Sequence, residues 1–216
     1  MFILDKENSL ALEFLSEIRN VHTQNDRWRF RKNLERLGEI MAYEISKTLD
    51  YQEATIKTPL AETKVKRLKE KPVLISVLRA AVPFYQGFLN YFDQSDSGFV
   101  GAYRKTDQEE HQEVEIDFLY QATPNLEGKE VILIDPMLAT GKSFVKTINN
   151  LLANGKPRII HIASVIAAPE GVAFIQNHVD LPFKIWTAAL DDHLNEKSYI
   201  VPGLGDAGDL CFGDKV

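Results

Sequence analysis

The sequence contains very little cysteine and no long hydrophobic run, and each absence excludes a class of protein. Cys211 is the one cysteine among 216 residues, so no disulfide can form within the chain, as is typical of a reducing compartment. No apolar run approaches the about 18 residues that a transmembrane helix requires, and the apolar start at residues 1–4 is too short for a signal peptide. These features predict a cytoplasmic protein with no membrane partner.

The chain also lacks an excess of basic residues and any grouping of histidines. Its net charge is −6 at pH 7, whereas a surface that binds nucleic-acid phosphates needs a basic excess, so we expect no nucleic-acid partner. The five histidines are scattered without the spacing of metal ligands, so the sequence predicts no metal site made of protein side chains. Nothing near Cys211 would make it a nucleophile, and we expect a partly buried thiol there.

What the sequence does contain is the pattern of one α/β domain covering residues 1–216. Hydrophobic residues make up 44% and charged residues 26%, as in globular proteins. After N-terminal helices within residues 1–50, the second of them with Asp26 available as its N-cap, strand-like runs alternate with helical ones, which favours a doubly wound sheet. We expect a central, mostly parallel sheet flanked by helices, with strands at residues 72–78, 131–134, 158–166 and 183–189 and helices at 83–92, 143–154 and 169–177.

Two other segments stand apart from this alternation. Strand-like runs at residues 99–105 and 113–120 flank a polar turn, and they predict a β-hairpin arm over residues 99–120, of the kind that packs on a partner subunit. Residues 51–58 alternate enough to form a strand, whereas the charged residues 62–71 indicate a loop.

The most informative stretch is residues 131–143. Four apolar residues, three of them β-branched, read as a buried strand, and Asp135, Pro136 and a turn of small residues lead to Ser143 at the start of a helical pattern. A carboxylate at the end of a strand and bare amides at a helix start suit a ligand that carries both hydroxyls and phosphate.

Three interpretations of this turn are open. Gly141, Lys142 and Ser143 match the end of a P-loop, but that motif needs a glycine where Pro136 stands, and proline has no N–H to offer phosphate, so a nucleoside kinase is disfavoured. In a phosphoribosyltransferase loop, Asp135 would hold the ribose hydroxyls and the amides of residues 140–143 would hold a 5′-phosphate. The third interpretation is an ordinary strand-turn-helix connection with a capping serine.

Two more regions are directed at the same edge of the predicted sheet. Arg79 follows the strand at 72–78, and its guanidinium group matches phosphate oxygens. Arg104 lies in the predicted arm and points either toward the acidic turn or back to the site. Residues 199–209 hold three glycines and two aspartates, and such dense glycine lets the backbone approach a flat ring and read it with N–H and C=O groups.

Six short segments together resemble one enzyme family. They are residues 78–80, 103–104, 135–141 with 143, 167–171, 194–196 and 199–209, and the most specific are Asp-Pro-Met-Leu-Ala-Thr-Gly at 135–141 and Pro-Gly-Leu-Gly-Asp-Ala-Gly at 202–208. On these residues the chain resembles the uracil phosphoribosyltransferases. The resemblance implies a type I phosphoribosyltransferase fold with a C-terminal base-binding hood (residues 190–216). It also implies pyrimidine salvage by conversion of uracil and 5-phosphoribosyl 1-diphosphate (PRPP) to UMP and diphosphate, with Mg²⁺ carried on the diphosphate.

The resemblance also implies roles for individual residues. Arg79 and Arg104 would serve the diphosphate, and Asp206 would reach both the donor and the base, so that Arg79, Arg104, Asp135 and Asp206 form the catalytic set. Uracil would be read at Ile200, Gly205, Asp206 and Ala207. The PRPP-binding loop would comprise Asp135, Pro136, Met137, Leu138, Ala139, Thr140, Gly141, Lys142 and Ser143.

The family assemblies are homodimers or higher homo-oligomers, which we expect here too, and activation by GTP is a further property to test. Lys142, Ala81 and Ser198 stand where the family usually has glycine. We expect Lys142 to make a peripheral phosphate contact, and Ala81 to alter the pocket wall near Arg79. The remaining alternative is a regulatory protein of this fold that senses nucleotides and binds RNA, against which the acidic balance weighs.

Overall fold

The computed structural model describes residues 1–104 and 116–214, and within these it leaves the side chains of residues 102–104 and 116–119 undescribed. The main sheet has the order β1-β10-β9-β7-β4-β5-β6, with the short β8 added to β9. Neighbouring strands are parallel except β5 and β6. The strands are β1 (Phe2–Ile3), β4 (Val73–Leu78), β5 (Ser97–Arg104), β6 (Ile116–Ala122), β7 (Glu130–Ile134), β8 (Met137–Leu138), β9 (Ile159–Ala167) and β10 (Phe183–Leu190).

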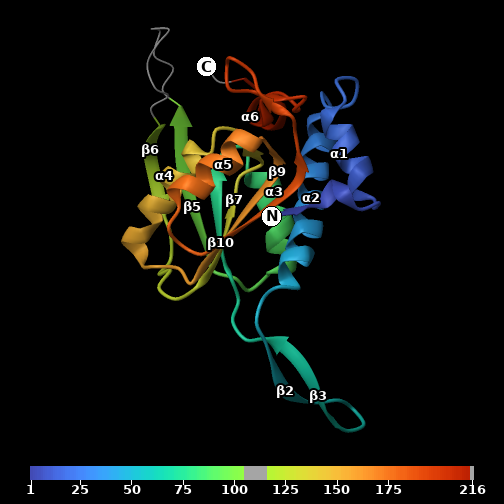
Figure 1. Ribbon diagram of the computed structural model, residues 1–216. Helices are drawn as coiled ribbons and strands as arrows, with labels where there is room; N and C mark the ends of the chain where they lie inside the picture. The colour runs from blue at the N-terminus through green and yellow to red at the C-terminus, as the bar shows by residue number, and fades with distance from the viewer. Residues whose placement is uncertain (105–115, 215–216) are drawn as a thin grey trace.

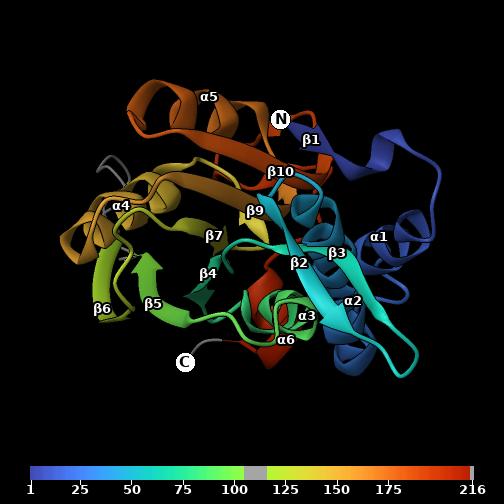
Figure 2. The same ribbon diagram turned by 90° about the horizontal axis from the view of Figure 1, so that it is seen from below.

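Helices cover both faces of this sheet, as Figure 2 shows. Helices α2 and α3 lie on one face of the sheet, and α4 and α5 lie on the other. The predicted mostly parallel sheet flanked by helices is therefore confirmed. The helices are α1 (Ala11–Arg19), α2 (Arg27–Ser46), α3 (Val82–Tyr91), α4 (Lys142–Leu151), α5 (Pro169–His178) and α6 (Ala207–Phe212), with 3₁₀ turns η1 (Leu4–Lys6) and η2 (Leu152–Asn154). None of the described helices is long and apolar enough to span a bilayer.

Burial on both faces explains why residues 131–134 of strand β7 are continuously apolar. Successive side chains of a strand point to opposite faces. Ile132 and Ile134 pack into the core beneath α2 and α3, while Val131 and Leu133 pack into the core beneath α4 and α5. Each such side chain contributes about 1.5–3 kcal/mol on burial. A strand covered on both faces therefore has no polar side.

The N-terminal helices form as their sequence patterns predict. Asp26 caps α2, and its carboxylate accepts a hydrogen bond from the Arg29 amide at 3.0 Å. Helix α2 then packs closely on α3, because Gly38 and Gly87 leave no side chain between them. A Cβ atom on Gly87 would lie 2.1 Å from the Glu35 carbonyl oxygen.

A hairpin that the sequence did not predict projects from the body of the molecule. Strands β2 (Tyr51–Lys57) and β3 (Glu62–Leu68) pair as an antiparallel hairpin that extends away from the body (Figure 1). The prediction of a loop over residues 62–71 was wrong, because β3 is exposed on both faces and so shows no alternation of apolar and polar residues. Strands β5 and β6 do pair antiparallel, but β5 is also parallel to β4, so this pair forms the edge of the main sheet. The turn predicted between them lies outside the described residues.

Candidate active site

The residues predicted to act on the ligand gather at the carboxyl edge of the main sheet. Asp135 follows β7 and Arg79 follows β4, and these two strands are parallel neighbours. Helix α6, from the C-terminal end of the chain, lies over the same end of the molecule (Figure 1). It approaches Arg79, whose guanidinium lies 3.7 Å from the Asp209 carboxylate. Segments from the middle and the end of the sequence thus meet above one sheet edge.

The loop after β7 is pinned to β9 along its length. The Asp135 amide donates to the Ala163 carbonyl at 3.1 Å, and the Asp135 carboxylate accepts from the Met137 amide at 3.1 Å. The carbonyl of Pro136 accepts hydrogen bonds from two β9 amides, and β8 adds a short parallel pairing. The sequence did not predict β8. Its pairing fixes the loop before helix α4 begins.

Helix α4 begins at a glycine rather than at a capping serine. Gly141 is the N-cap, with φ +76°, and no side chain caps the helix there. The interpretation of Ser143 as a capping residue was therefore wrong, since Ser143 is the second residue of the helix. The amides of a first helical turn have no acceptor within the helix, and here the intrahelical bonds start with the Val145 amide. This is the backbone arrangement that binds phosphate.

Burial divides the predicted loop residues into two sets. The side chains of Pro136, Leu138 and Ala139 are buried, as is Gly141, and Leu138 belongs to the core beneath α4 and α5. These four can offer a ligand only backbone groups. The partly exposed set consists of Asp135, Met137, Thr140, Lys142 and Ser143.

Gly141 also makes a close contact with helix α5. A Cβ on Gly141 would lie 2.7 Å from the Gly171 carbonyl oxygen, and a Cβ on Gly171 would lie 2.1 Å from the Ala139 carbonyl oxygen. The loop and the first turn of α5 therefore touch backbone to backbone. This contact explains Gly171, which the sequence analysis quoted within residues 167–171 without giving it a role.

The neighbouring Glu170 connects this loop to the hood. Its carboxylate accepts a hydrogen bond from the Leu194 amide at 2.9 Å, and this bond holds the pKa of the Glu170 carboxyl below its ordinary value. Leu194 belongs to β11 (His193–Leu194), which pairs antiparallel with β12 (Ile200–Val201) at the start of the hood segment. Residues 167–171 thus support both halves of the site.

Within the hood, Asp206 has a structural task that the sequence analysis missed. Its carboxylate caps α6, accepting from the amides of Gly208 at 2.7 Å and Asp209 at 3.0 Å. The other predicted uracil positions divide by burial. Ile200 and Ala207 are 5% and 2% exposed, so only their backbone groups can face a ligand, whereas Gly205 is exposed with φ +92°.

Of the two arginines predicted to serve the diphosphate, Arg79 is the one whose side chain the structure describes. It is 46% exposed and opposes Asp209, and its peptide bond to Leu78 is cis. Arg104 ends β5, and its side chain lies outside the described part of the molecule.

The three departures from glycine differ in their cost. Ala81 has φ −71° and ψ −18°, a right-handed conformation that any residue adopts, and Lys142 is the first residue of a helix. Neither backbone position requires glycine. Ser198 has φ +59°, the left-handed region in which a side chain is strained by about 1 kcal/mol. Asn195 stabilises this turn by accepting from the amides of Lys197 and Tyr199.

Cys211 is fully buried rather than partly buried, and burial raises the pKa of its thiol to about 12. The thiol is therefore protonated at neutral pH and cannot act as a nucleophile. The described residues also contain no group of three or more histidine, cysteine or carboxylate side chains that could hold a metal ion.

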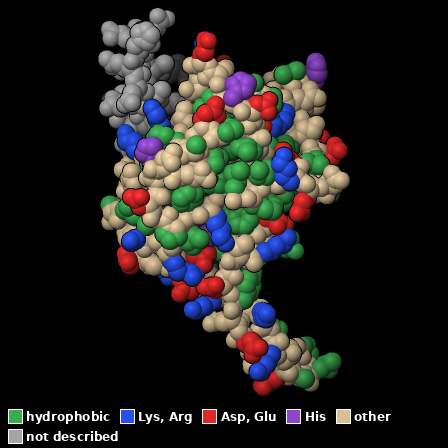
Figure 3. All heavy atoms as spheres, in the orientation of Figure 1, with side chains coloured by type: hydrophobic (Ala, Val, Ile, Leu, Met, Phe, Trp, Pro, Cys, Tyr) green, Lys and Arg blue, Asp and Glu red, His purple; other side chains and the backbone are tan. Residues whose placement is uncertain are grey.

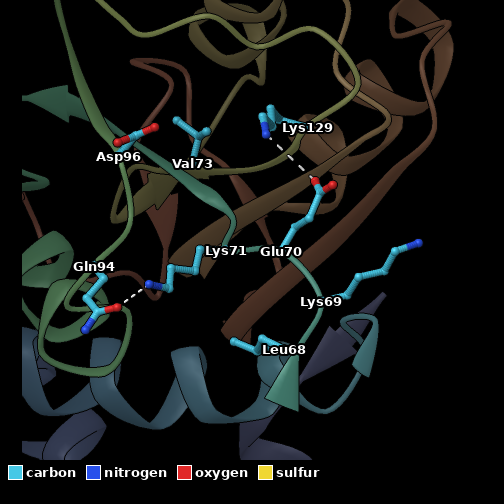
Figure 4. A pocket seen from close by; sticks show the side chains of 8 residues that line it. All are labelled: Leu68, Lys69, Glu70, Lys71, Val73, Gln94, Asp96 and Lys129. Carbon is cyan, nitrogen blue, oxygen red and sulfur yellow. Dashed lines mark hydrogen bonds and ion pairs between the residues drawn. The ribbon is translucent and has the colours of Figure 1, made fainter. Parts of the chain in front are cut away.

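A hollow lies at the opposite, amino-terminal edge of the sheet, away from the candidate active site (Figure 4). It has a volume of about 340 Å³ and is lined by Lys69, Lys71, Lys129 and Asp96, among others. Lys71 bonds to Gln94 and Lys129 pairs with Glu70 at 3.8 Å, so these two cations already have partners.

On the face seen in Figure 3, acidic and basic side chains are interspersed, without the continuous basic area that nucleic acid requires.

Comparison with known proteins identifies relatives along the whole chain. A family model described as uracil phosphoribosyltransferase matches residues 6–214. A uracil phosphoribosyltransferase of Porphyromonas gingivalis is 47% identical over 213 residues, covering 99% of this chain and 98% of that protein. One from Pyrococcus furiosus is 36% identical, covering 98% and 89%. The solved structure of an Aquifex aeolicus protein matches with a TM-score of 0.85 at 30% identity, covering 97% of each chain.

Proposed function

Because the chain belongs to the uracil phosphoribosyltransferase family, it is a pentosyltransferase of the type I phosphoribosyltransferase fold, and we propose that it acts at the carboxyl edge of its sheet. There it transfers the phosphoribosyl group of PRPP to uracil, giving UMP and diphosphate. The observation that carries this assignment is the meeting of the 135–143 loop, Arg79 and helix α6 at one edge. The family assignment favours this function over a kinase or an RNA-binding regulator.

The 135–143 loop binds the ribose phosphate of PRPP. The amides of the first turn of α4, together with the positive end of the helix dipole, hold the 5′-phosphate. The Asp135 carboxylate accepts hydrogen bonds from the ribose hydroxyls. Lys142, which is partly exposed at the first position of α4, adds a peripheral charge near the phosphate.

Arg79 binds the leaving diphosphate. In the structure it faces Asp209 at 3.7 Å, a distance too long for a hydrogen bond, so little is lost when it turns to phosphate oxygens. Arg104 serves the same group. Fixed cations here stabilise the transition state more than the ground state, because the bond to the diphosphate breaks as negative charge grows on it.

Uracil is read by the backbone of the hood. Ile200 and Ala207 are buried and Gly205 has no side chain, so these positions can contact the base only through their backbone N–H and C=O groups. A ring with alternating donors and acceptors pairs with such groups, and a base with a different order of donors leaves them unpaired. The described residues offer no evident general base for uracil N1.

Magnesium enters on the diphosphate. Mg²⁺ prefers oxygen ligands and commonly keeps substrate phosphates among them. The Asp209 carboxylate is suited to contact this ion. One of its oxygens lies beside Arg79 and is buried without a hydrogen-bond partner. When bound, Mg²⁺ would neutralise charge on the leaving group.

The enzyme is a cytoplasmic homo-oligomer in this proposal. The β2–β3 hairpin supports the assembly, because a two-stranded hairpin is marginally stable alone in water, and its Leu60 is 97% exposed. Activation by GTP is tested by adding it to the assay. The test of the function itself is formation of labelled UMP from uracil and PRPP with Mg²⁺, with cytosine and orotate as competing bases; well-folded protein that makes no UMP would contradict it.

A further inference from the structure

Both backbone polar groups of Gly203, a hood residue, are held by one ion pair. The Gly203 amide donates to the Asp191 carboxylate at 2.8 Å, and the Arg19 guanidinium donates to the Gly203 carbonyl oxygen at 3.0 Å. Arg19 also donates to Asp191 through both terminal nitrogens, one of them at 2.9 Å. A single charged pair therefore satisfies the N–H and the C=O of the same residue.

The ion pair is largely buried, so its loss would be costly. The Asp191 side chain is 4% exposed and that of Arg19 is 22% exposed. A buried carboxylate that loses its partner is strongly destabilised, whereas the two-pronged guanidinium contact fixes orientation as well as charge. Neither residue was singled out from the sequence, because they are 172 positions apart and gain meaning only from the fold.

The position of Gly203 determines that of the predicted uracil site next to it. It has φ +63°, and a Cβ there would lie 2.1 Å from the Ile200 carbonyl oxygen. The turn is thus closed tightly on Ile200, and Gly205 to Ala207 follow within four residues. Backbone groups cannot change rotamer to follow a displaced ligand, so their alignment with a base depends on this turn.

The turn is fixed to rigid elements at the base of the hood. Arg19 ends α1, while Asp191 follows β10 and its amide donates to the Ala167 carbonyl at 2.8 Å. The donor loop also lies on β9, but its hydrogen bonds there and its backbone contact with Gly171 do not involve the side chains of Arg19 and Asp191. A change at the ion pair should therefore reach the base and spare the ribose phosphate.

We propose that Arg19 and Asp191 are positioning residues for uracil, acting through Gly203 on the backbone that reads the base. The inference rests on the proposed function and extends it to residues of the N-terminal helix and the end of β10. Neither side chain needs to touch the substrate. Their role is to set the alignment, and with it the selectivity, of the base site.

The test compares the two substrates in steady-state kinetics of Asp191→Asn and Arg19→Gln. We expect the KM for uracil to rise about tenfold or more, since displacement of a site by about 1 Å has effects of this size or larger. The KM for PRPP should stay within about twofold of wild type, because the donor loop keeps its anchors. The preference for uracil over cytosine, measured as a ratio of kcat/KM values, should fall. Arg19→Lys, which keeps the charge but loses the fork, should lie between wild type and Arg19→Gln.

Arg29→Gln is the matched control. It removes a second arginine–carboxylate pair that involves α1, in which Arg29 of α2 binds Glu17 of α1. Among the described residues, neither of these two bonds to the hood. This variant should lower the melting temperature and leave both KM values unchanged. Gly203→Ala should reproduce the uracil defect of Asp191→Asn.

Four results would overturn the inference. An Asp191→Asn enzyme with the uracil KM of wild type would show that the pair does not position the base, and equal rises in both KM values would indicate a general loss of structure. If the stronger variants do not fold, an Arg19→Lys enzyme with unchanged uracil KM and selectivity overturns it equally. Wild-type enzyme is assayed first, and the absence of uracil-dependent diphosphate release would overturn the proposed function and this inference together.

Discussion

The contact between Gly171 and the donor loop allows one substitution to be worked through in detail. In Gly171→Ala the new Cβ would stand 2.1 Å from the Ala139 carbonyl oxygen and 3.1 Å from that of Leu138. Both are backbone atoms, so no side chain can turn aside, and the loop and α5 must separate by about 1 Å to reach van der Waals contact. Overpacking of this kind costs about 1–3 kcal/mol, against which the better helix propensity of alanine returns about 0.5–1 kcal/mol.

The effect on activity should exceed the effect on stability. A displacement of about 1 Å in a group that positions a substrate can reduce the rate about 10²-fold. We therefore expect Gly171→Ala to raise the KM for PRPP and lower kcat/KM for PRPP by about 10- to 100-fold, with a smaller change in the KM for uracil. Steady-state assays at saturating uracil, with a thermal melt of the same sample, measure both quantities.

Gly87→Ala provides the control for this experiment. Its Cβ would also lie 2.1 Å from a backbone oxygen, that of Glu35, but between α2 and α3 and away from the donor loop. It should lower stability by a similar amount and leave the KM for PRPP unchanged. If Gly171→Ala loses stability as Gly87→Ala does and yet binds PRPP normally, the assignment of the 135–143 loop to the donor phosphate is refuted.

Three further changes test other parts of the account. Lys142→Gly should weaken PRPP binding a few-fold at low salt and less at high salt, because salt screens a peripheral charge. A variant that binds PRPP as tightly as the wild type at both salt concentrations would exclude the phosphate contact. Ser198→Gly should raise the free energy of unfolding by up to about 1 kcal/mol, because glycine relieves the left-handed φ of +59°; a chemical denaturation curve that shifts the other way would contradict this. Hydrogen bonds from Arg29 and Asn33 lower the pKa of the Glu17 carboxyl from 4.5 to about 2, so its contribution is complete above pH 4.5 and is lost as the pH falls toward 2. Glu17→Gln should therefore cost about 1 kcal/mol at pH 7 and nothing at pH 2, as measured by denaturation at each pH.

The parts of the fold that the sequence predicts are those in which neighbours along the chain determine the structure. Strand β7 is recognisable because burial on both faces makes residues 131–134 continuously apolar, and Asp26 is recognisable as the cap of α2. The hairpin strand β3 escaped prediction because it is exposed on both faces in the isolated chain, so no periodicity marks it. The hairpin predicted at residues 99–120 was recognisable, because its strands β5 and β6 flank a polar turn in the sequence, and the two strands pair antiparallel.

The candidate site shows the same division. Local sequence patterns predict where strands end and helices begin. They therefore made Asp135, Arg79 and the 135–143 loop detectable. The tasks of Gly171 and Asp191 depend on atoms from segments far away in the chain, and no local pattern reports such contacts. Asp206 shows a third case, in which the residue was identified but its capping of α6 was not.

The central claim is that the edge formed by the donor loop and the hood joins uracil to a phosphoribosyl group, and one assay tests it most directly. Purified protein is mixed with PRPP, Mg²⁺ and labelled uracil, and UMP and diphosphate are quantified together. We expect the two products to appear in equal amounts and only when uracil is present. Cytosine and orotate should neither replace uracil nor compete well with it. Folded protein that releases no UMP, or that releases diphosphate without uracil, would contradict it.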